Sequence, residues 1–481
     1  MISTPTCSKR PPAWLSTVLV GIVIMMAVSA ASAQTFTSLV ELNGSDGSNP
    51  YYMSLVQARD GNLYGTTQSG GSAFAGSVFR LTTAGTLTTL YNFCSLASCT
   101  DGAFPAGGLV LGTDGNLYGT TVEGGTSNFG TFFKITTAGT LTTLHSFIST
   151  DAAWPYSALV QAPDGSFWGT SFEGGTFNGG TVYKVTAAGI VTTLYNFCTE
   201  SRCTDGADPE SALLRASDGN YYGVTPFGGA SNLGTVFKVT QAGIFTKLHD
   251  FAPSDGAQPW GALIQNGSAF YGTSAAGGSS SACLGGCGTI FKVTSTGTVT
   301  TIHNFILSDG ASPVAGLIQG TDGNFYGTTL FGGTSSDGNI FKSTVTGTVT
   351  SLHSFVGTDG DMPYGGLVQH TNGTFYGMTT YGGNMSCVPS GCGTAFSEAT
   401  GASAFVKLVP TSGKAGSSVV ILGTQLTGAT SVSFNGTSAT FTVVSPSQIK
   451  ATVPVGATSG KVKVVTPHGT RVSNVSFTVI K

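Results

Sequence analysis

Aspartate recurs at one position of the chain that could bind a cation. Seven aspartates each lie four residues before a proline: Asp46, Asp101, Asp151, Asp205, Asp255, Asp309 and Asp359. Carboxylates gathered around one opening could hold a metal ion or attract a basic ligand. However, six of them precede Gly, which signals a turn, and like charges in one ring would repel. We therefore interpret these aspartates as turn caps that accept hydrogen bonds from backbone amides.

Four histidines occupy a second repeated position, where the other copies have Val40, Tyr91 or Tyr195: His145, His249, His303 and His353. A metal site needs several ligands within about 2–2.3 Å of one ion. These histidines fall in separate copies, on strands expected at the outer rim. We interpret them as packing residues, and because His370 and His468 are isolated, we predict neither a metal site nor a cofactor.

Aromatic residues beside the prolines differ from copy to copy, as the residues of a binding surface would. They are Tyr51, Trp154, Tyr156, Trp260 and Tyr364, and a second group lies in other loops: Phe129, Phe177, Phe227, Phe331 and Tyr381. Flat aromatic rings suit the apolar faces of sugars. Our hypothesis is that the first group binds a ligand, so that Trp154→Ala combined with Trp260→Ala should abolish ligand retention without unfolding. Ordinary loop packing is the alternative for each residue.

Catalysis would require an acid and a base, or a nucleophile and its base, held in one place. The carboxylates of the loops that do not repeat are Glu123, Glu173, Asp208 and Glu210, and Arg202 is a lone cation among them. No spacing identifies a catalytic pair, and we predict no catalytic residue. Residues brought together from separate copies keep a polysaccharide lyase or hydrolase open as the alternative.

These residues are positioned by a repeated element. An aromatic residue followed by Gly recurs seven times, in steps of 54, 50, 54, 49, 55 and 50 residues: Tyr64, Tyr118, Trp168, Tyr222, Tyr271, Tyr326 and Tyr376. A period near 50 in a Gly-rich, strand-rich chain is typical of a β-propeller. With 71 glycines and 9% charged residues, the composition suits many tight turns and few helices.

One unit predicts four short strands, over residues 140–147, 157–161, 166–170 and 180–186. The run at 157–161 begins with small residues and is assigned to the innermost strand, where blades converge. The seventh unit lacks its outermost strand, and residues 35–42 have the matching sequence. The sequence therefore predicts an all-β fold, a seven-bladed propeller over residues 35–402 that the N-terminal strand closes.

Turn chemistry separates two faces of this propeller. Asp-Gly or Asn-Gly pairs connect the first and second strands of each blade as tight hairpins. The longer connections alternate with them and lie on the opposite face, and they contain four close cysteine pairs: Cys94/Cys99, Cys198/Cys203, Cys283/Cys287 and Cys387/Cys392. We predict four local disulfides, because the pairs fall in different repeats and lack the spacing of a zinc site.

The first 33 residues are typical of a secretory signal peptide. Lys9 and Arg10 precede an apolar stretch, and Ala31-Ser32-Ala33 forms a small-residue cleavage site. Without Lys9 and Arg10 the chain has 17 basic and 22 acidic residues, a net charge of −5, which argues against nucleic acid as a partner. We predict a secreted or cell-surface protein with no transmembrane segment in the mature chain. The sequence specifies no oligomeric state.

The pattern GGLV-x-GTDGNLYGTT-x-x-GGT-x-x-x-GT-x-FK-x-T-x-AGTLTTL, almost complete from Gly107 to Leu144, resembles the GloVer (Gloeo-Verruco) repeat of exported bacterial proteins. The resemblance covers residues 35–402. It implies an extracellular propeller joined to varied C-terminal modules, and it supplies no catalytic motif.

Residues 403–481 resemble an IPT/TIG domain, an immunoglobulin-like β-sandwich, in the runs GSSVVILG, SVSFN, QIKATVP and GKVKVVTP. The resemblance implies a spacer or a protein-contact module. Galactose-oxidase-like enzymes also join a propeller to such a domain. They require a copper site with a Tyr-Cys pair and converging histidines, whereas the cysteines here pair locally.

Together these patterns favour an exported, nonenzymatic binding or adhesion protein that recognises an extracellular polysaccharide or a surface protein through the long-loop face. A purely structural role in the envelope is a further alternative, which predicts no soluble ligand.

Deleting residues 35–42 tests the closure of the ring. The deletion removes the strand that completes the last blade and exposes a sheet edge, so the melting temperature of the whole propeller should fall. An unchanged melting temperature in the truncated protein would contradict closure by this strand.

Overall fold

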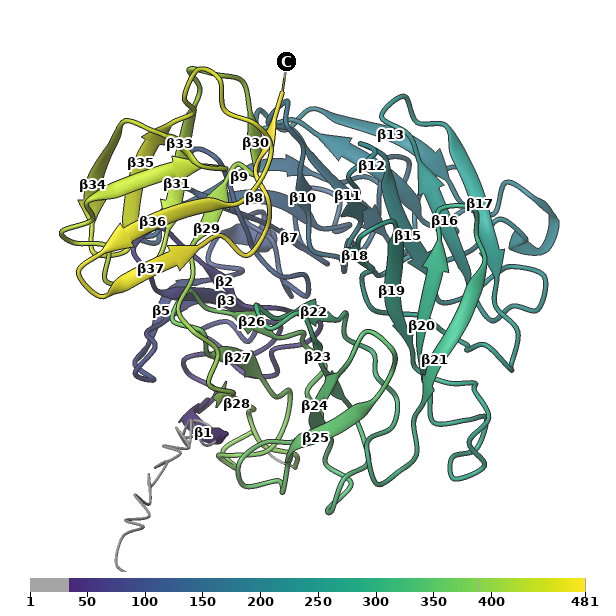
Figure 1. Ribbon diagram of the computed structural model, residues 1–481. Coiled ribbons are helices and arrows are strands. Elements are labelled where there is room, and N and C mark those ends of the chain that lie inside the picture. The colour runs from purple at the N-terminus through teal and green to yellow at the C-terminus, as the bar shows by residue number, and fades with distance from the viewer. Residues whose placement is uncertain (1–33, 388, 481) are drawn as a thin grey trace, which may run out of the picture.

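The computed structural model describes residues 34–387 and 389–480 (Figure 1). The predicted signal peptide, residues 1–33, lies outside the described residues. The described chain is all-β apart from two short 3-10 turns, η1 (Ala97–Cys99) and η2 (Ser201–Cys203). None of the helices in the described ranges is long and apolar enough to cross a membrane.

Within the described ranges, strands β1 to β28 form four-stranded antiparallel sheets, which we number I to VII in chain order. Sheet I contains β2 (Val56–Gln57), β3 (Leu63–Thr67), β4 (Ser77–Leu81) and β5 (Leu87–Asn92). Sheet II contains β6 (Val110–Leu111), β7 (Leu117–Thr121), β8 (Thr131–Ile135) and β9 (Leu141–Ser146). Sheet III contains β10 (Val160–Gln161), β11 (Phe167–Ser171), β12 (Thr181–Val185) and β13 (Val191–Asn196). Sheet IV contains β14 (Leu214–Arg215), β15 (Tyr221–Thr225), β16 (Thr235–Val239) and β17 (Phe245–Asp250). Sheet V contains β18 (Ile264–Asn266), β19 (Ala269–Ser274), β20 (Thr289–Thr294) and β21 (Val299–Asn304). Sheet VI contains β22 (Ile318–Gln319), β23 (Phe325–Thr329), β24 (Asn339–Ser343) and β25 (Val349–Ser354).

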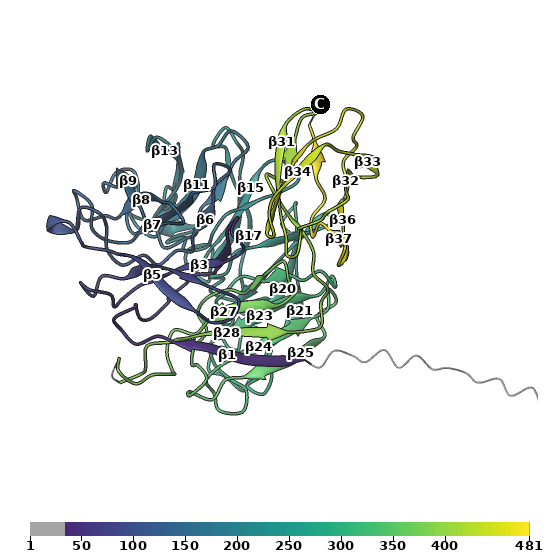
Figure 2. The same ribbon diagram turned by 90° about the vertical axis from the view of Figure 1, so that its left-hand side faces the viewer.

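Sheet VII combines the two ends of this region. It contains β26 (Val368–Gln369), β27 (Phe375–Met378), β28 (Thr394–Ala399) and, at its outer edge, β1 (Thr35–Glu41). Strand β1 runs antiparallel to β28, with Phe36 opposite Glu398, and the two lie side by side in Figure 2. The N-terminal segment is therefore hydrogen-bonded to a strand more than 350 residues away in sequence.

Apolar side chains pack between neighbouring sheets. One buried cluster joins sheets I and II, with Tyr64 and Phe133 among its members, and equivalent clusters join II to III, III to IV, IV to V, V to VI and VI to VII. A further cluster contains Phe79 of sheet I and Tyr376 of sheet VII, so the series returns to its start. The sheets thus surround a common centre, and the core consists of the spaces between them.

The aromatic-Gly pair belongs to a repeated run of eight residues, DGNLYGTT at 114–121, which we call the octet. Hydrogen bonds within one hairpin explain this octet. In sheet II, Asp114 Oδ1 accepts the Asn116 backbone N–H (3.1 Å), and Asp114 Oδ2 accepts both the Asn116 amide (2.6 Å) and the Tyr118 hydroxyl (2.9 Å). Sheets I, IV and VI repeat this arrangement. In sheet III the aromatic residue is Trp168, which has no hydroxyl, and Lys184 Nζ binds the turn aspartate instead, 2.8 Å from Asp164 Oδ2.

The glycine after the aromatic residue is required by packing. A Cβ on Gly119 would lie 2.7 Å from Cζ of Phe133 and 2.8 Å from Cδ2 of Leu109, closer than atoms of a folded core approach. The next strand therefore places its phenylalanine over a bare backbone, which is why the pair of aromatic residue and Gly recurs in every sheet.

The innermost strands are shorter than the sequence predicts. The run 157–161 forms a strand only at Val160–Gln161, and the other sheets have similarly short innermost strands. The preceding residues instead approach the neighbouring sheets. A Cβ on Gly107 would lie 2.6 Å from the Ser157 carbonyl oxygen, and one on Gly365 would lie 2.1 Å from that of Met53. The residues just before each innermost strand therefore pack against the neighbouring sheet and do not form β-ladder hydrogen bonds within their own sheet.

The C-terminal part forms two four-stranded sheets and a two-stranded one. The first has the order β29 (Lys407–Val409), β31 (Ser418–Leu422), β35 (Gln448–Thr452), β34 (Phe441–Ser445), and the second has the order β33 (Thr437–Ser438), β32 (Ser431–Phe434), β36 (Val462–Thr466), β37 (Gly469–Val472). Strands β30 (Ser412–Gly413) and β38 (Thr478–Val479) pair in parallel. Residues of both larger sheets share one buried cluster, which includes Val419, Ile449 and Val464. We call this part the sandwich.

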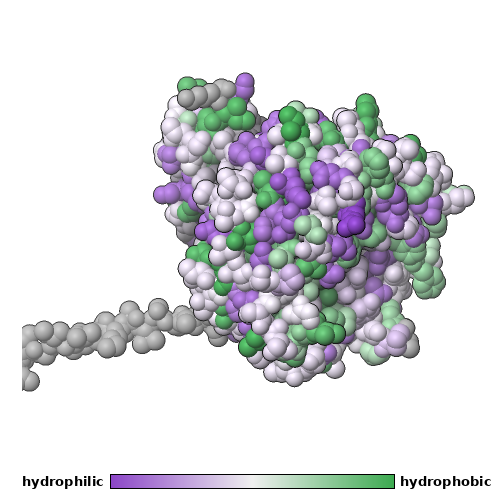
Figure 3. All heavy atoms as spheres, turned by 90° about the vertical axis from the view of Figure 1, so that its right-hand side faces the viewer, coloured by the Kyte–Doolittle hydropathy of each residue, from purple (hydrophilic) through white to green (hydrophobic). Residues whose placement is uncertain are grey.

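The sandwich contacts the side of the ring that carries the tight hairpins. Ser447 Oγ donates to the Arg59 carbonyl oxygen (2.8 Å), and the Phe405 N–H donates to that of Thr371 (3.0 Å). A cavity between the two parts is lined by the innermost strands of sheets I, II and VII and by Lys407 and Leu408. The opposite side of the ring, with the long loops, is left uncovered by these contacts. On the side of the molecule drawn in Figure 3, hydrophobic and hydrophilic residues are mixed.

Gly119→Ala tests the packing role of the octet. The added methyl group must displace Phe133 or Leu109, so the free energy of unfolding should fall by about 1–3 kcal/mol, measured by denaturant unfolding. Tyr118→Phe is the comparison, because it removes only one hydroxyl bond and should cost about 0.5–1.5 kcal/mol. A Gly119→Ala protein as stable as the parent would show that the close approach is not required.

Candidate binding site at the mouth of the ring

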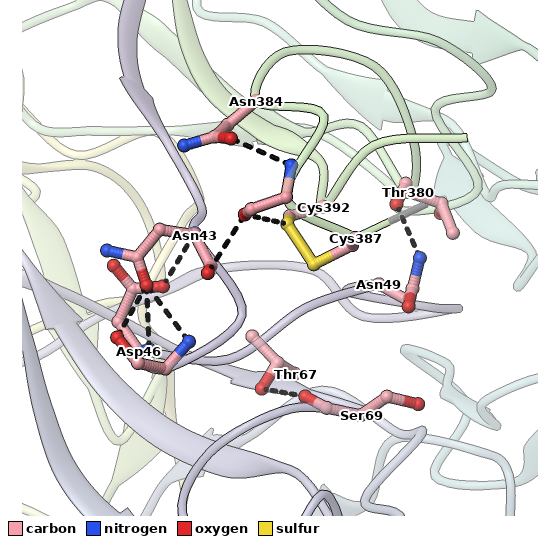
Figure 4. Close-up of a disulfide and its surroundings, with 11 residues drawn as sticks. Asn43, Asp46, Asn49, Thr67, Ser69, Thr380, Asn384, Cys387 and Cys392 are labelled. Carbon is pink, nitrogen blue, oxygen red and sulfur yellow. Dashed lines mark hydrogen bonds between the residues drawn. A yellow bond between two sulfur atoms is a disulfide. The ribbon is translucent and has the colours of Figure 1, made fainter. Parts of the chain in front are cut away.

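The two kinds of long loop in each repeat lie on one face and bind each other. Backbone bridges join them in every sheet, for example between Ala103 and Glu123 and between Ala153 and Glu173. The four predicted disulfides are confirmed, and all lie in these loops: Cys94–Cys99, Cys198–Cys203, Cys283–Cys287 and Cys387–Cys392. Figure 4 shows the Cys387–Cys392 loop beside Asn43, whose carbonyl oxygen accepts the Ser386 hydroxyl (3.0 Å). The face is thus a network of cross-linked loops on a ring of sheets.

Cys287 is more deeply buried than most of the disulfide cysteines. Its side chain is 0% exposed and belongs to the buried cluster between sheets V and VI, with Ile290 and Phe305, while Cys283 packs against that cluster from its edge. The reason is its place in the chain, since Cys287 directly precedes the Gly that leads into β20. Its carbonyl oxygen also accepts the Ser312 N–H from the next repeat (2.9 Å). This disulfide therefore ties its loop to the core, and Cys392, also fully buried, does the same between sheets VII and I.

The repeated aspartates and histidines form pairs at the rim. His145 Nε2 lies 2.9 Å from Asp151 Oδ2, while Asp151 Oδ1 accepts the Ile148 N–H (2.9 Å). Three other repeats contain the same pair, at 2.9–3.0 Å. The carboxylates are therefore engaged locally in turns, as the turn-cap interpretation expects, and they do not line the mouth.

Loop length explains the repeats that lack histidine. Where a disulfide loop lengthens the connection, the strand residue is tyrosine, and its hydroxyl donates to the aspartate: Tyr91 to Asp101 and Tyr195 to Asp205, both at 2.8 Å. In the repeat with Val40, Asp46 accepts the Asn43 N–H (3.0 Å). We interpreted these positions separately from sequence. The signal for the pairing was present, since tyrosine occurs only together with the loops that contain Cys94 and Cys198.

One residue of each repeat is directed to the mouth by a fixed backbone turn. The residue before each loop proline has a left-handed conformation, as at Trp154 (φ 54°) and Asp208 (φ 55°). The residues after the prolines are Tyr51, Ala106, Tyr156, Glu210, Trp260, Val314 and Tyr364. Five of these, together with Tyr52, line one cavity: Tyr156, Glu210, Trp260, Val314 and Tyr364.

Tyr52 occupies the centre of this group, and sequence reasoning missed it. Its ring centroid lies 4.4 Å from that of Tyr51, 5.6 Å from Tyr364 and 6.4 Å from both Tyr156 and Trp260. Sheet I has one more residue between its proline and the following leucine than the other repeats, and Tyr52 accommodates it with a φ of 52°. The count of residues between Pro50 and Leu55 could have revealed the insertion.

The cavity extends from the aromatic group between the beginnings of the innermost strands. Its volume is about 240 Å³, and its lining below the rings consists mainly of small residues such as Ser54, Ala158 and Gly261. The lining contains one carboxylate, Glu210, and neither lysine nor arginine. The site therefore combines aromatic faces, small polar groups and an acid.

The carboxylates that do not repeat converge on this site. Burial and the nearby charge of Asp208 raise the pKa of Glu210 to about 8, while a hydrogen bond from Tyr52 opposes the rise. Burial and the charge of Glu173 raise the pKa of Asp208 to about 6. Burial also raises the pKa of Tyr156, with contributions from Glu210, Glu123 and Glu173. Glu173 thus acts on Asp208 from a separate repeat, Asp208 acts on Glu210, and Glu123 acts on the shared neighbour Tyr156.

The remaining predicted residues lie outside the cavity. Trp154 packs beside Phe172, with ring centroids 6.4 Å apart, and it does not line the cavity. Phe227 packs edge-on against Trp260 at 5.5 Å, whereas the side chain of Phe177 is 53% exposed. Arg202 is exposed in η2, beside its disulfide.

The chain belongs to the Gloeobacter/Verrucomicrobia repeat family, whose model matches residues 21–162, 153–285 and 275–440. The IPT/TIG domain model matches residues 404–479. Both resemblances are thereby confirmed, and the third repeat match extends into the sandwich. None of the curated proteins matches the sequence.

Three solved structures resemble this chain at low sequence identity. A fungal alcohol oxidase of the AA5 family, in complex with copper, is 13% identical with a TM-score of 0.53, and the match covers 93% of this chain and 99% of that one. The periplasmic gluconolactonase of Pseudomonas aeruginosa is 17% identical with a TM-score of 0.42, over 63% of this chain and 85% of that one. A putative 6-phosphogluconolactonase from Bacteroides uniformis is 18% identical with a TM-score of 0.45, over 68% and 89%.

The described residues do not supply ligands for a copper ion like that of the oxidase. Among them, no group of three or more His, Cys, Asp and Glu side chains could hold a metal ion. Four histidines bind rim aspartates, and buried His370 bonds through Nε2 to the Gly61 carbonyl oxygen (2.9 Å) on the side of the sandwich. His468 is exposed on the sandwich. We therefore derive no chemistry through a metal.

Asp309→Ala tests the structural role of the rim aspartates. The change removes the acceptor for His303 and for the Ile306 N–H, so the free energy of unfolding should fall by about 1–3 kcal/mol. The exposed neighbour Ser308 provides the control, because Ser308→Ala should change stability by less than about 0.5 kcal/mol. Calcium and chelator should leave both melting temperatures unchanged. A rise with calcium that Asp309→Ala abolishes would instead make the aspartate a metal ligand.

Proposed function

We propose that this protein is an exported seven-bladed β-propeller, closed by its N-terminal strand, that binds an extracellular carbohydrate or a surface protein through the mouth of the ring. The propeller would comprise residues 35–402 and the IPT/TIG sandwich residues 403–481. The four disulfides fit an oxidising compartment.

The observation that carries the proposal is the aromatic group around the cavity. Tyr52, Tyr156, Trp260 and Tyr364 come from four different sheets and meet at one opening. The repeat itself does not require aromatic residues there, since the same position is Ala106 or Val314 in other sheets. Ring faces beside hydroxyl and carboxyl groups are the combination that holds a sugar, with stacking on one side and hydrogen bonds around its edge.

Carbohydrate is favoured over a protein partner by the shape of the site. A cavity of about 240 Å³ admits a single sugar residue or the terminal group of a larger ligand. A stable protein interface is far larger than this opening, because it buries roughly 1,200 Å² or more of total surface. A surface protein would have to use the surrounding loops as well. The sandwich, on the opposite side of the ring, would serve as a spacer or a second contact site.

Cleavage of a polysaccharide is the second candidate, and one observation favours it. Asp208 and Glu210 are neighbouring acids whose pKa values are raised to different levels, about 6 and about 8, as in pairs that divide the roles of base and acid. Binding without cleavage remains our proposal. The two functions differ in whether fragments are released from a bound polymer.

A glycan array tests the proposal, with released fragments monitored on the same surfaces. Trp260→Ala should weaken retention of the bound glycan at least about tenfold, because the ring lines the cavity. Trp154→Ala is the matched control and should retain binding, since Trp154 packs against Phe172 instead.

Equal binding by the parent and Trp260→Ala would place the ligand elsewhere. Released fragments would identify an enzyme. Binding to no glycan would favour a protein partner, which cross-linking through the sandwich could capture.

A further inference from the structure

The cavity at the mouth of the ring is lined by an acid and by no basic residue. Glu210 lines the cavity, and Asp208, Glu173 and Glu123 act electrostatically on the same group of residues. The lining of the cavity includes neither lysine nor arginine. A ligand that enters removes water from these acids, so it must either carry a positive charge or leave them protonated.

The aromatic rings favour the first of these outcomes. The faces of tyrosine and tryptophan carry negative electrostatic potential and attract cations within about 6 Å of the ring centre. Tyr52, Trp260 and Tyr364 lie around the same cavity as Glu210. An ammonium group would thus meet ring faces and a carboxylate together, an arrangement that repels phosphate, sulfate and uronate groups.

We propose that the mouth of the ring recognises a polysaccharide of free amino sugars, with one glucosamine-type residue in the cavity and its ammonium group on Glu210. This inference rests on the proposed function and specifies its ligand. The pyranose ring would stack on an aromatic face, as in neutral sugar recognition, while the ammonium group supplies the missing positive charge. Acetylation of the amine removes that charge and adds bulk.

The size of the cavity supports a single residue. At about 240 Å³, it is smaller than the roughly 300–1,000 Å³ of sites for drug-sized ligands. Neighbouring sugars of the polymer would lie over the loops, where Tyr51 and Phe172 provide further aromatic surface.

Binding of the ammonium group has a proton signature. Burial and Asp208 hold the pKa of free Glu210 at about 8, so its carboxyl is mostly protonated at pH 7. The cation favours the ionised form, and binding should release a proton from Glu210. The other titratable groups that face this region are Asp208, Glu173, Glu123 and the hydroxyls of Tyr51, Tyr52, Tyr156 and Tyr364. Affinity should therefore rise with pH for as long as the amine keeps its proton.

The test compares two oligosaccharides with one backbone, the glucosamine hexamer and the N-acetylglucosamine hexamer, by titration calorimetry in two buffers of different ionisation enthalpy. The full mature chain should bind the free-amine hexamer at least about tenfold more tightly and release protons on binding. Glu210→Gln should remove this preference. Glu200→Gln is the matched control, because Glu200 is an exposed carboxylate in the same loop between β13 and β14.

The outcomes separate this inference from the proposed function. Equal affinity for the two hexamers, or binding of other glycans but of neither hexamer, would overturn the amino-sugar inference and leave carbohydrate binding intact. A preference that survives in Glu210→Gln would move the ammonium site away from this residue and overturn the assignment. Failure to bind any glycan would overturn both. Because the comparison of ligands needs only the parent protein, an unstable variant would not prevent a decision.

Discussion

Neighbouring sheets approach most closely where their innermost strands begin, and the rest of the ring depends on this contact. A Cβ on Gly107 would lie 2.6 Å from the Ser157 carbonyl oxygen, and one on Gly261 would lie 2.6 Å from the Ala315 carbonyl carbon. Glycine, alanine or serine occupies these positions in six of the sheets and Met53 does so in sheet I, so the positions vary little in chemistry. The residue after each proline lies just outside the contact, and it can have any size. The side chains at the mouth therefore differ mainly in one residue of each sheet, the residue after the proline. Near-identical repeats can in this way form an asymmetric site while the fold stays the same.

The buried carboxyl group of Glu210 makes folding less favourable when no ligand is bound. The folded protein keeps a proton on Glu210 up to about pH 8, whereas an unfolded chain loses it near the ordinary pKa of 4.5. Between these values folding takes up a proton, so this residue makes the protein less stable as pH rises. The rim differs in this respect, because each of its aspartates has a hydrogen-bond donor from the backbone or from a strand residue. An acid without a basic partner thus occurs where the repeat pattern is broken, which is typical of a functional position rather than a structural one.

The repeats were predictable because their determinants are local in sequence. The octet contains the turn aspartate, the tyrosine that binds it and the glycine under the next phenylalanine, so the four-strand units and the disulfides could be derived from the chain alone. The site was less accessible, because its residues come from different sheets and their proximity depends on the ring. Sequence reasoning identified Tyr156, Trp260 and Tyr364 near the mouth but included Trp154, whose left-handed backbone turns it toward Phe172. It missed Tyr52. The residue inserted after Pro50 shows that the backbone of sheet I must differ from the other repeats, but it does not show whether Tyr51 or Tyr52 then lies at the centre of the aromatic group.

The position of the sandwich restricts how the site can work. The sandwich contacts the ends of innermost strands β2, β6 and β26, whereas the aromatic group precedes the beginnings of such strands. At about 3.3 Å per residue, the six steps from Tyr51 to Gln57 place the two regions up to about 20 Å apart. Because the sandwich lies at the far end, the groups that bind the ligand must all come from the loops of the ring. A polymer can then reach the mouth from the open side while the sandwich is engaged elsewhere. Under the proposed function, recognition at the mouth and any second contact made by the sandwich would therefore lie at opposite ends of the ring.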